Sequence, residues 1–335
     1  MRLQFRPSRT GAIRGAALAA GLMLATACAN AAELSLLSSF DSTQTPTYAV
    51  LDRYMKNVEM VGGDTVTFKV SGPETVPIFE QLEPVSSGAF AVLYTHPVFH
   101  AGDGGLALAV DAIDVDPVAR RESGVWDAID NFYQAQHNLK LVAMMSVSME
   151  GYHLFTKEPL SPEGDLAGRK VRGTPTYFGP IKALGAEPVV LPGSEIYSAL
   201  QTGIVDGAGW PAAGMLSMKH YEVAKYRLRP TFGAATQPVF VNLDVWNGLS
   251  KEEQSVLLEA GRITELEMPW IGNHIQAAED AKLDALGVKI ETLSPEKAAE
   301  VQKAFYDTIW GLADNCCGVA SASLKELALK ADLTK

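Results

Sequence analysis

Apolar and polar positions along the chain alternate with two different periods, and this pattern predicts strands and helices in turn. Short apolar runs bounded by turn residues predict strands at 33–37, 65–70, 89–94, 140–147 and 152–156. Stretches with helical spacing predict helices at 47–61, 77–87 and 122–137. Because strand and helix follow one another throughout, we expect an α/β architecture with mostly parallel sheets.

The second half of the chain continues this alternation. The pattern predicts a short strand ending at 172, a helix at 174–185, a strand at 187–191, a helix at 195–202 and a strand at 204–206. The last of these leads into the segment 206–211 (DGAGWP). Its small residues allow a backbone or a ligand to approach closely.

A much longer helical pattern follows at 250–286. At 1.5 Å per residue such a helix would be ~55 Å long, which exceeds the width of a small domain. Ser250 and Glu253 resemble a capping box at its start, and Pro269 is expected to bend the helix without ending it. We therefore expect a strut that runs along two domains.

The first 31 residues have the three parts of a secretory signal peptide. Four arginines precede an uncharged apolar segment at 15–27, and small residues follow at 29–31 (ANA). The apolar segment is shorter than the ~20 residues needed to span a bilayer. Lipoprotein processing at Cys28 is disfavoured because leucine is missing three residues earlier. The sequence therefore predicts cleavage after Ala31 and a periplasmic protein.

The length of the chain indicates the number of domains, and its charge limits the kinds of partner. A chain of 335 residues favours two domains, because a domain typically has about 150 residues. The net charge is −11, and removal of the four N-terminal arginines leaves 24 basic and 39 acidic residues. Such an acidic protein is a poor match for nucleic acid or an anionic membrane. An anionic ligand would need a local basic anchor.

Sequence motifs for catalysis, for a cofactor or for a metal site do not occur. Pro97 disfavours a helix that would place His96 and His100 on one face, and no zinc-peptidase glutamate follows. Cys316 and Cys317 are adjacent, which is the wrong spacing for zinc; a vicinal disulfide or two thiols are the alternatives. We expect no enzyme activity, no cofactor and no metal.

Residues 165–211 carry the most specific pattern in the chain. The segments GRKVR (168–172), LGA (184–186) and YSALQTGIVDG (197–207) follow at a characteristic spacing, and VNLDVW (241–246) precedes the long helix. With these segments the chain resembles the solute-binding proteins of tripartite ATP-independent periplasmic (TRAP) transporters over nearly its whole mature length.

The resemblance implies a two-lobed periplasmic binding protein fold (class II-like), with a ligand cleft between the lobes and a long strut helix. It places lobe one at 32–150 plus 238–277 and lobe two at 151–237 plus 278–335. It also implies a receptor, expected as a monomer, that delivers a small organic acid to membrane permease subunits. A periplasmic sensory protein, or an enzyme acting on a small carboxylate, is the alternative.

Arg172 is the candidate anchor for the ligand. A guanidinium stays charged and presents paired N–H donors that match the two oxygens of a carboxylate. Arg172 stands where the family's arginine binds the substrate carboxylate, so the resemblance implies this role here. Judged without the motif, the residue would suit an ordinary surface position.

Four further residues are ligand-binding candidates. Trp210 stands where family members have a ligand-binding asparagine or a tryptophan beside the ligand, and core packing is its alternative. Some relatives that bind keto acids with a metal ion have glutamates where this chain has Gly209 and Gln237, so Gln237 is expected to bind ligand without metal. Tyr94 and Tyr152 stand at strand ends, where ligand crevices lie, or else belong to the edge of the core.

Overall fold

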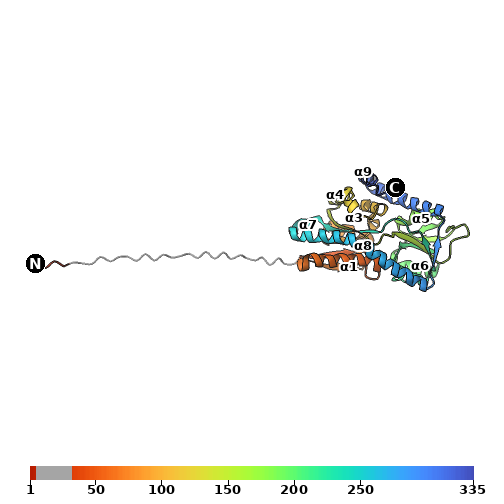
Figure 1. Ribbon diagram of the computed structural model, residues 1–335, viewed down its shortest axis with the longest axis horizontal. Helices are drawn as coiled ribbons and strands as arrows, with labels where there is room; N and C mark the ends of the chain where they lie inside the picture. Colours follow the sequence, from red (N-terminus) through yellow and green to blue (C-terminus); the bar gives the residue numbers. More distant parts are fainter. Residues whose placement is uncertain (5–31) are drawn as a thin grey trace. The chain divides into compact units, whose positions relative to one another are not determined.

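The fold is built on two mixed β-sheets. The computed structural model describes residues 1–4 and 32–335, and the fold is that of residues 32–335 (Figure 1). From residue 5 onward the predicted signal peptide lies outside the described residues. Sheet one has the order β2-β1-β3-β10-β4, and sheet two has the order β11-β9-β5-β8-β6-β7. The strands of sheet one are β1 (Ala32–Ser38), β2 (Val66–Ser71), β3 (Val92–Tyr94), β4 (Leu139–Ser146) and β10 (Thr236–Asn242). Those of sheet two are β5 (Tyr152–Thr156), β6 (Lys170–Arg172), β7 (Glu187–Val189), β8 (Gly207–Pro211), β9 (Tyr226–Arg229) and β11 (Lys289–Thr292).

Helix α1 (Thr45–Gly62) shows how the apolar pattern produces the core. Val50 and Leu51 are adjacent, and Tyr54 follows about one turn later on the same face. All three are fully buried. Proline is tolerated in the first turn, and the helix is capped at its C-terminus by Gly63, whose φ of +55° suits glycine. The other helices are α2 (Leu82–Ser86), α3 (Pro117–Glu122), α4 (Val125–His137), α5 (Phe178–Ala183), α6 (Ile196–Thr202), α7 (Leu243–Gly248), α8 (Lys251–Ala285) and α9 (Pro295–Lys330).

Within residues 32–335 the chain passes between the sheets through 147–151, through 230–235 and along α8. The strands that follow the first two passages, β5 and β10, pair antiparallel with both of their neighbours. The other pairs are parallel, as the alternation of strand and helix predicts. Five of the nine strand pairs are therefore parallel, and the sheets are mixed because β5 and β10 reverse the direction of pairing.

Helix α8 is the predicted strut. Ser250 and Glu253 form the capping box, and the helix continues through Pro269. Its first half packs against α1 and β4, where the backbone N–H of Met144 donates to the buried carboxylate of Glu265. Its second half reaches sheet two, where Asp280 pairs with Arg227 of β9. One helix thus bridges both sheets, which confirms the two-lobed fold with a bracing helix.

The last helix, α9, also contacts both parts of the fold. It packs against α5 and against the 3-10 helix η4 (Gly105–Ala112). Beyond it, the backbone N–H of Asp114 donates to Leu333, and the Thr334 hydroxyl donates to the carbonyl of Ala112. The end of the chain therefore returns to the segment that the sequence analysis placed in lobe one. Cys316 and Cys317 are adjacent within α9, and their two sulfur atoms are in contact.

Several predicted elements differ in extent. The helix expected at 77–87 is a 3-10 turn at Ile78–Glu80 followed by the short α2. The helix expected at 122–137 divides at Gly124, whose φ of +82° ends one helix and begins the next. The strand expected at 204–206 begins later in the chain, as β8. Gly207 makes this possible, because a Cβ there would lie 2.6 Å from the carbonyl oxygen of Phe155.

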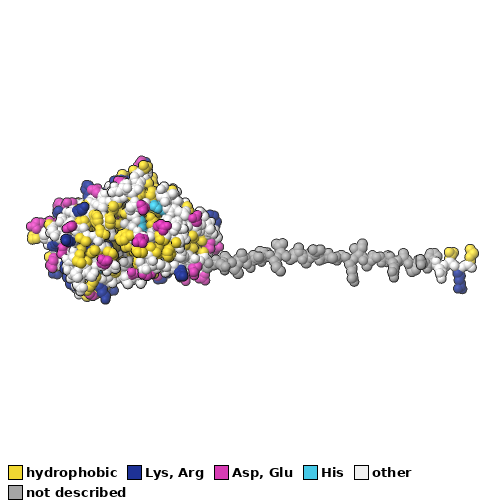
Figure 2. Space-filling model, turned by 180° about the vertical axis from the view of Figure 1, so that it is seen from behind, with side chains coloured by type: hydrophobic (Ala, Val, Ile, Leu, Met, Phe, Trp, Pro, Cys, Tyr) yellow, Lys and Arg dark blue, Asp and Glu magenta, His cyan; other side chains and the backbone are white. Residues whose placement is uncertain are grey.

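The surface agrees with an acidic protein. On the face shown in Figure 2, acidic side chains are scattered among apolar and neutral ones. Among the described helices, none combines the length and apolarity required of a membrane-spanning segment.

Candidate functional site

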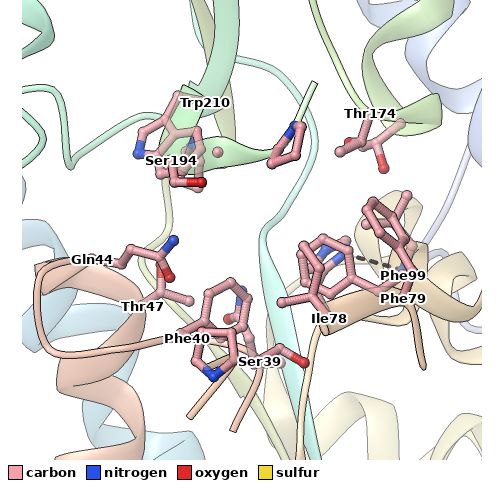
Figure 3. A pocket seen from close by; sticks show the side chains of 18 of the residues that line it. Ser39, Phe40, Gln44, Thr47, Ile78, Phe79, Phe99, Thr174, Ser194 and Trp210 are labelled. Atoms are coloured by element: carbon pink, nitrogen blue, oxygen red, sulfur yellow. Dashed lines mark hydrogen bonds between the residues drawn. The ribbon is translucent and has the colours of Figure 1, made fainter. Parts of the chain in front are cut away.

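A cavity of about 150 Å³ is lined by residues from both sheets and their loops. Figure 3 shows Trp210, Ser194 and Thr174 facing Gln44, Thr47 and Phe40 across it. The first three come from segments around sheet two and the other three from segments around sheet one. The polar lining residues are Ser39, Asp41, Gln44, Thr47, His96, Tyr152, Arg172, Thr174, Thr176, Tyr177, Ser194 and Gln237. A cavity between two lobes, lined by aromatic and polar side chains, suits a small molecule.

Arg172 lies at the end of β6 and lines this cavity. Its residue surface is only 4% exposed. The Nε–H donates to the carbonyl of Leu191 at 2.9 Å, and Nη1 donates to the carbonyl of Gly209 at 3.2 Å. These two bonds fix the guanidinium. The two N–H groups of Nη2 and one N–H group of Nη1 have no hydrogen-bond partner among the described residues. Burial lowers the pKa of Arg172 to about 10, so the side chain is charged at neutral pH.

Arg172 has no acidic partner among the described residues. None of the ion pairs between these residues includes it. A buried charge is costly unless a counter-ion accompanies it. The arrangement therefore favours an anion in the cavity, where the free donors can form a bidentate bond with a carboxylate.

Trp210 and its neighbours form one wall of the cavity. The guanidinium carbon of Arg172 lies 5.7 Å from the centre of a Trp210 ring. The preceding residue, Gly209, allows Tyr177 to pack closely, because a Cβ at Gly209 would lie 2.3 Å from Cδ1 of that ring. The expectation that small residues in this segment permit a close approach is confirmed. The approaching group is an aromatic ring of the protein itself.

Tyr152 lines the cavity through a buried polar network. Its hydroxyl donates to Oδ2 of Asp111 at 2.6 Å and lies 2.8 Å from Nε2 of His96. The His96 Nδ1 accepts from the backbone N–H of Val98, so Nε2 carries the proton in the neutral ring and donates to Asp111. Sequence reasoning treated His96 as a loop histidine. Only its position directly after a buried strand could have indicated the cavity.

Gln237 lines the cavity from β10 and is 2% exposed. Its Oε1 is buried and has no hydrogen-bond partner among the described residues, and the same is true of Oε1 of Gln44. Buried side-chain oxygens normally accept a hydrogen bond. Sequence reasoning missed Gln44, which precedes α1 without capping it.

Tyr94 is the one sequence candidate that does not line the cavity. It is fully buried, and its hydroxyl donates to the carbonyl of Thr47 at 2.6 Å. The ring packs edge-on against Phe40, which does line the cavity. The structure therefore brings Arg172, Trp210, Tyr152 and Gln237 together and gives Tyr94 the alternative role at the edge of the core.

A two-lobed α/β fold with a small-molecule cavity between the lobes is the architecture of a solute-binding protein. Residues 114–310 match the family described as bacterial extracellular solute-binding protein, family 7. The match covers more than half of the chain, so the protein belongs to this family, the solute-binding proteins of TRAP transporters. The family is one of substrate-binding proteins of transporters and is not an enzyme family.

Individual relatives agree with this assignment. The chain is 27% identical over 290 residues to a solute-binding protein of Sulfitobacter sp. (strain NAS-14.1), covering 84% of each chain. It is 35% identical over 129 residues to the ectoine-binding periplasmic protein TeaA of Halomonas elongata, covering 38% of this chain and 37% of that one. The fold is similar to a TRAP periplasmic solute binding protein from Desulfovibrio salexigens with bound orotic acid. That similarity has a TM-score of 0.76 at 21% identity and covers 89% of this chain and 98% of the other.

Proposed function

We propose that this protein captures a small organic acid in the periplasm and delivers it to the membrane permease subunits of a TRAP transporter. The observation that carries the proposal is the buried guanidinium of Arg172, which faces the cavity without an acidic partner among the described residues. Binding of a carboxylate supplies the missing counter-ion, and the cavity walls exclude water from the pair.

The proposed ligand class also has support from the relatives. Two of them bind ectoine and orotic acid, which are small molecules with a carboxylate group. Trp210 and Tyr177 provide flat apolar surface beside Arg172, which suits the carbon skeleton of such an acid. We propose that the protein acts without catalysis and without a metal ion, as a monomer.

The proposed lobes are residues 32–150 with 238–277 and residues 151–237 with 278–335, and the C-terminal residues contact both. Because the cavity has walls from both sheets, the ligand binds best when the lobes are closed over it. The passages at 147–151 and 230–235 are short and lead into the strands that carry Tyr152 and Gln237, which both line the cavity, and this suits a hinge.

Mass spectrometry of the small molecules released from the purified protein tests the ligand class. We expect a compound with a carboxylate group that rebinds and raises the melting temperature by mass action. Small-angle scattering should then show a more compact protein with this compound than without it. A released compound without an acidic group, or turnover of the compound by the protein, would contradict the proposal.

A further inference from the structure

The charged groups around the cavity limit the charge that a ligand can carry. Arg172 is the only arginine or lysine among the described residues that line it, and Asp41 is the only acid. A second carboxylate, that of Asp111, lies directly behind the wall, 2.6 Å from the hydroxyl of Tyr152 and 3.0 Å from Nε2 of His96. A ligand with two carboxylates would bring the second one near these acids without a basic partner, which is unfavourable. The charges therefore favour a monocarboxylate.

The two acids are also poorly placed to bind a cationic group of a ligand. Oδ1 of Asp111 accepts from the backbone N–H of Thr236 at 3.1 Å, and its Oδ2 accepts from two side chains of the wall. Asp41 is partly exposed, and its Oδ1 accepts from the backbone N–H and the hydroxyl of Thr43. Water can therefore solvate Asp41, and the body of the ligand need not carry a charge.

Three phenylalanines give the cavity an apolar wall. Phe40 follows β1, Phe79 lies in the turn Ile78–Glu80, and Phe99 lies in the turn Pro97–His100. The ring of Phe99 is 5.9 Å from that of Phe40 and 5.6 Å from that of Phe79, centre to centre. All three rings are partly exposed, and Figure 3 shows Phe79 and Phe99 together on one side of the cavity. Phenylalanine is usually buried, so apolar rings gathered at a cavity indicate a surface that a ligand covers.

The wall from sheet two is aromatic as well. Trp210 and Tyr177 line the cavity there, and the guanidinium of Arg172 lies beside Trp210. The cavity has a volume of about 150 Å³, and an apolar protein cavity of that size takes up benzene. A single aromatic ring thus fits between the walls, where packing of ring on ring adds to the effect of burial.

We infer that the ligand is a monocarboxylate whose body is a single aromatic ring, held between the phenylalanines and Trp210. The inference rests on the proposed function, because Arg172 must bind the carboxylate. A dicarboxylate would lack a second basic partner. A sugar acid would cover the phenylalanine rings with hydroxyl groups that these rings cannot bind.

A panel of acids tests the inference on the purified protein by calorimetry and thermal shift. Benzoate and phenylacetate are the probes, and cyclohexanecarboxylate and cyclohexylacetate are their saturated analogues. Isophthalate adds a carboxylate, phenylalanine adds an ammonium group, and succinate and gluconate lack the ring. We expect the better aromatic probe to bind at least about tenfold more tightly than these last four, and at least about threefold more tightly than its saturated analogue.

A variant of the phenylalanine wall tests where the ring lies. Phe79 is 49% exposed, so Phe79→Ala should fold normally. We expect it to weaken binding of the better aromatic probe by about fivefold or more, because the ring loses a packing partner. The matched control is Trp270→Ala, which removes an aromatic side chain of α8 that is 65% exposed and does not line the cavity. This control should bind the probe as the wild type does.

The outcomes separate the inference from the proposed function. If an acid with a second charge, without a ring or with a saturated ring binds as tightly as the aromatic probe, and Arg172→Ala abolishes its binding, the inference is overturned while the proposed function stands. An acid without an aromatic ring among the released compounds, or wild-type affinity in Phe79→Ala, would likewise overturn the inference alone. If no acid binds, or if Arg172→Ala leaves binding unchanged, the proposed function is contradicted and the inference falls with it.

Discussion

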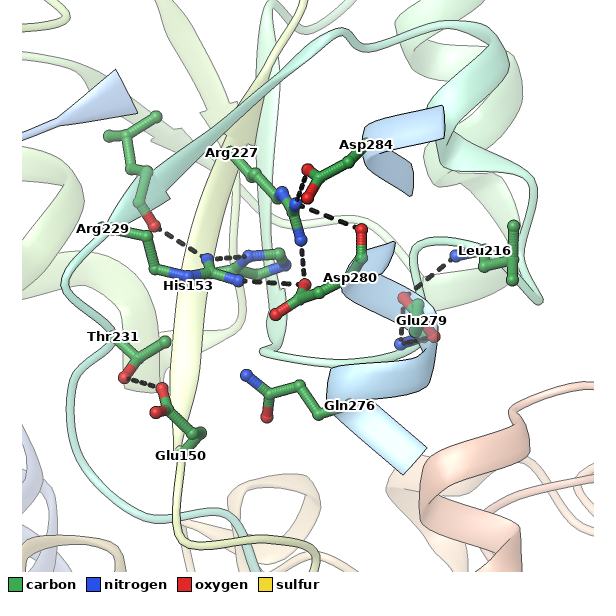
Figure 4. Close-up of polar contacts among 12 residues, drawn as sticks. Glu150, His153, Leu216, Arg227, Arg229, Thr231, Gln276, Glu279, Asp280 and Asp284 are labelled. Atoms are coloured by element: carbon green, nitrogen blue, oxygen red, sulfur yellow. Dashed lines mark hydrogen bonds and ion pairs between the residues drawn. The ribbon is translucent and has the colours of Figure 1, made fainter. Parts of the chain in front are cut away.

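Two buried arginines on sheet two have opposite surroundings, and the difference separates a structural charge from a functional one. Arg227 on β9 has a fully buried side chain and pairs with Asp280 and Asp284 of α8 (Figure 4). Arg172 on β6 is nearly as buried, but no acid of the described chain reaches it. Both charges need a counter-ion. Asp280 and Asp284 supply the counter-ion of Arg227, and we propose that a bound ligand supplies that of Arg172.

The helix α8 explains why the two sites differ. Its last three turns carry acidic side chains toward sheet two: Glu279 accepts from the backbone N–H of Gly214 at 2.9 Å, and Asp280 also lies 3.5 Å from Arg229. Figure 4 shows these acids grouped around one side of the sheet. The acidic side chains of α8 thus attach this helix to lobe two. Arg172 in the cavity forms no ion pair with them.

Removal of the cavity arginine should have the largest effect, and it should act on binding. We expect Arg172→Ala to weaken binding of the released acid by ~2–5 kcal/mol, because the buried carboxylate loses its partner. Arg172→Lys should restore only part of the affinity, since an ammonium cannot form the bidentate bond. Calorimetry measures both variants, and circular dichroism confirms folding.

The control for this prediction is Arg262→Ala, which removes an exposed arginine of α8 paired with Glu259. We expect it to leave the affinity unchanged. Wild-type affinity in Arg172→Ala would show that the two buried arginines do not differ in function.

Removal of the acids around Arg227 should act on stability instead. The double variant Asp280→Asn, Asp284→Asn leaves a buried guanidinium without its carboxylates. Because both acids are partly exposed, we expect a loss in the free energy of unfolding of about 2–3 kcal/mol, at the lower end of the effect of breaking a buried ion pair. Urea unfolding measures it. Affinity for the acid in the folded variant should stay within about threefold, and a larger loss would mean that this cluster belongs to the binding site.

Substitution of Gly209 should affect both stability and binding, by a smaller amount. A Cβ there would overlap the ring of Tyr177, so this ring, which lines the cavity, must shift. We expect Gly209→Ala to cost about 1–3 kcal/mol in the free energy of unfolding and to weaken binding. The matched control is Gly311→Ala in α9, where a Cβ meets no atom within 4 Å and alanine favours the helix. Equal melting temperatures for the two variants would contradict the close packing of Tyr177.

The fold was largely predictable from sequence because its elements follow local patterns. The capping box at Ser250 and the glycine that ends α1 are encoded within a few residues. The direction of strand pairing was not predictable in this way. Whether β5 and β10 pair parallel or antiparallel with their neighbouring strands depends on which sheet the chain enters. A local sequence pattern does not encode this.

The site was predictable where the family resemblance marked it, and at Tyr152, whose place at a strand end suggested the cavity. Arg172 and Trp210 belong to the segment that resembles the family, and both line the cavity. Gln44 and His96 lie in loops far away in sequence and join the site only through folding. Tyr94 shows the opposite case, since its position at a strand end suggested the cavity while its hydroxyl is used within the core.

The smallest expected effect is that of pH on ligand binding near neutrality. Burial lowers the pKa of Arg172 only to about 10, so the guanidinium keeps its charge below pH 9. Burial and the nearby Arg172 lower the pKa of His220 to about 3, and that ring stays neutral beside Trp210. A ligand carboxylate with an ordinary pKa near 4 is ionised above pH 6. Affinity measured by calorimetry from pH 6 to 8.5 should therefore change by less than about threefold. Above pH 9 it should fall, because deprotonation of Arg172 removes the charge that holds the carboxylate. A tenfold change between pH 6 and 8 would show that another titrating group, and not this arginine alone, controls the anion.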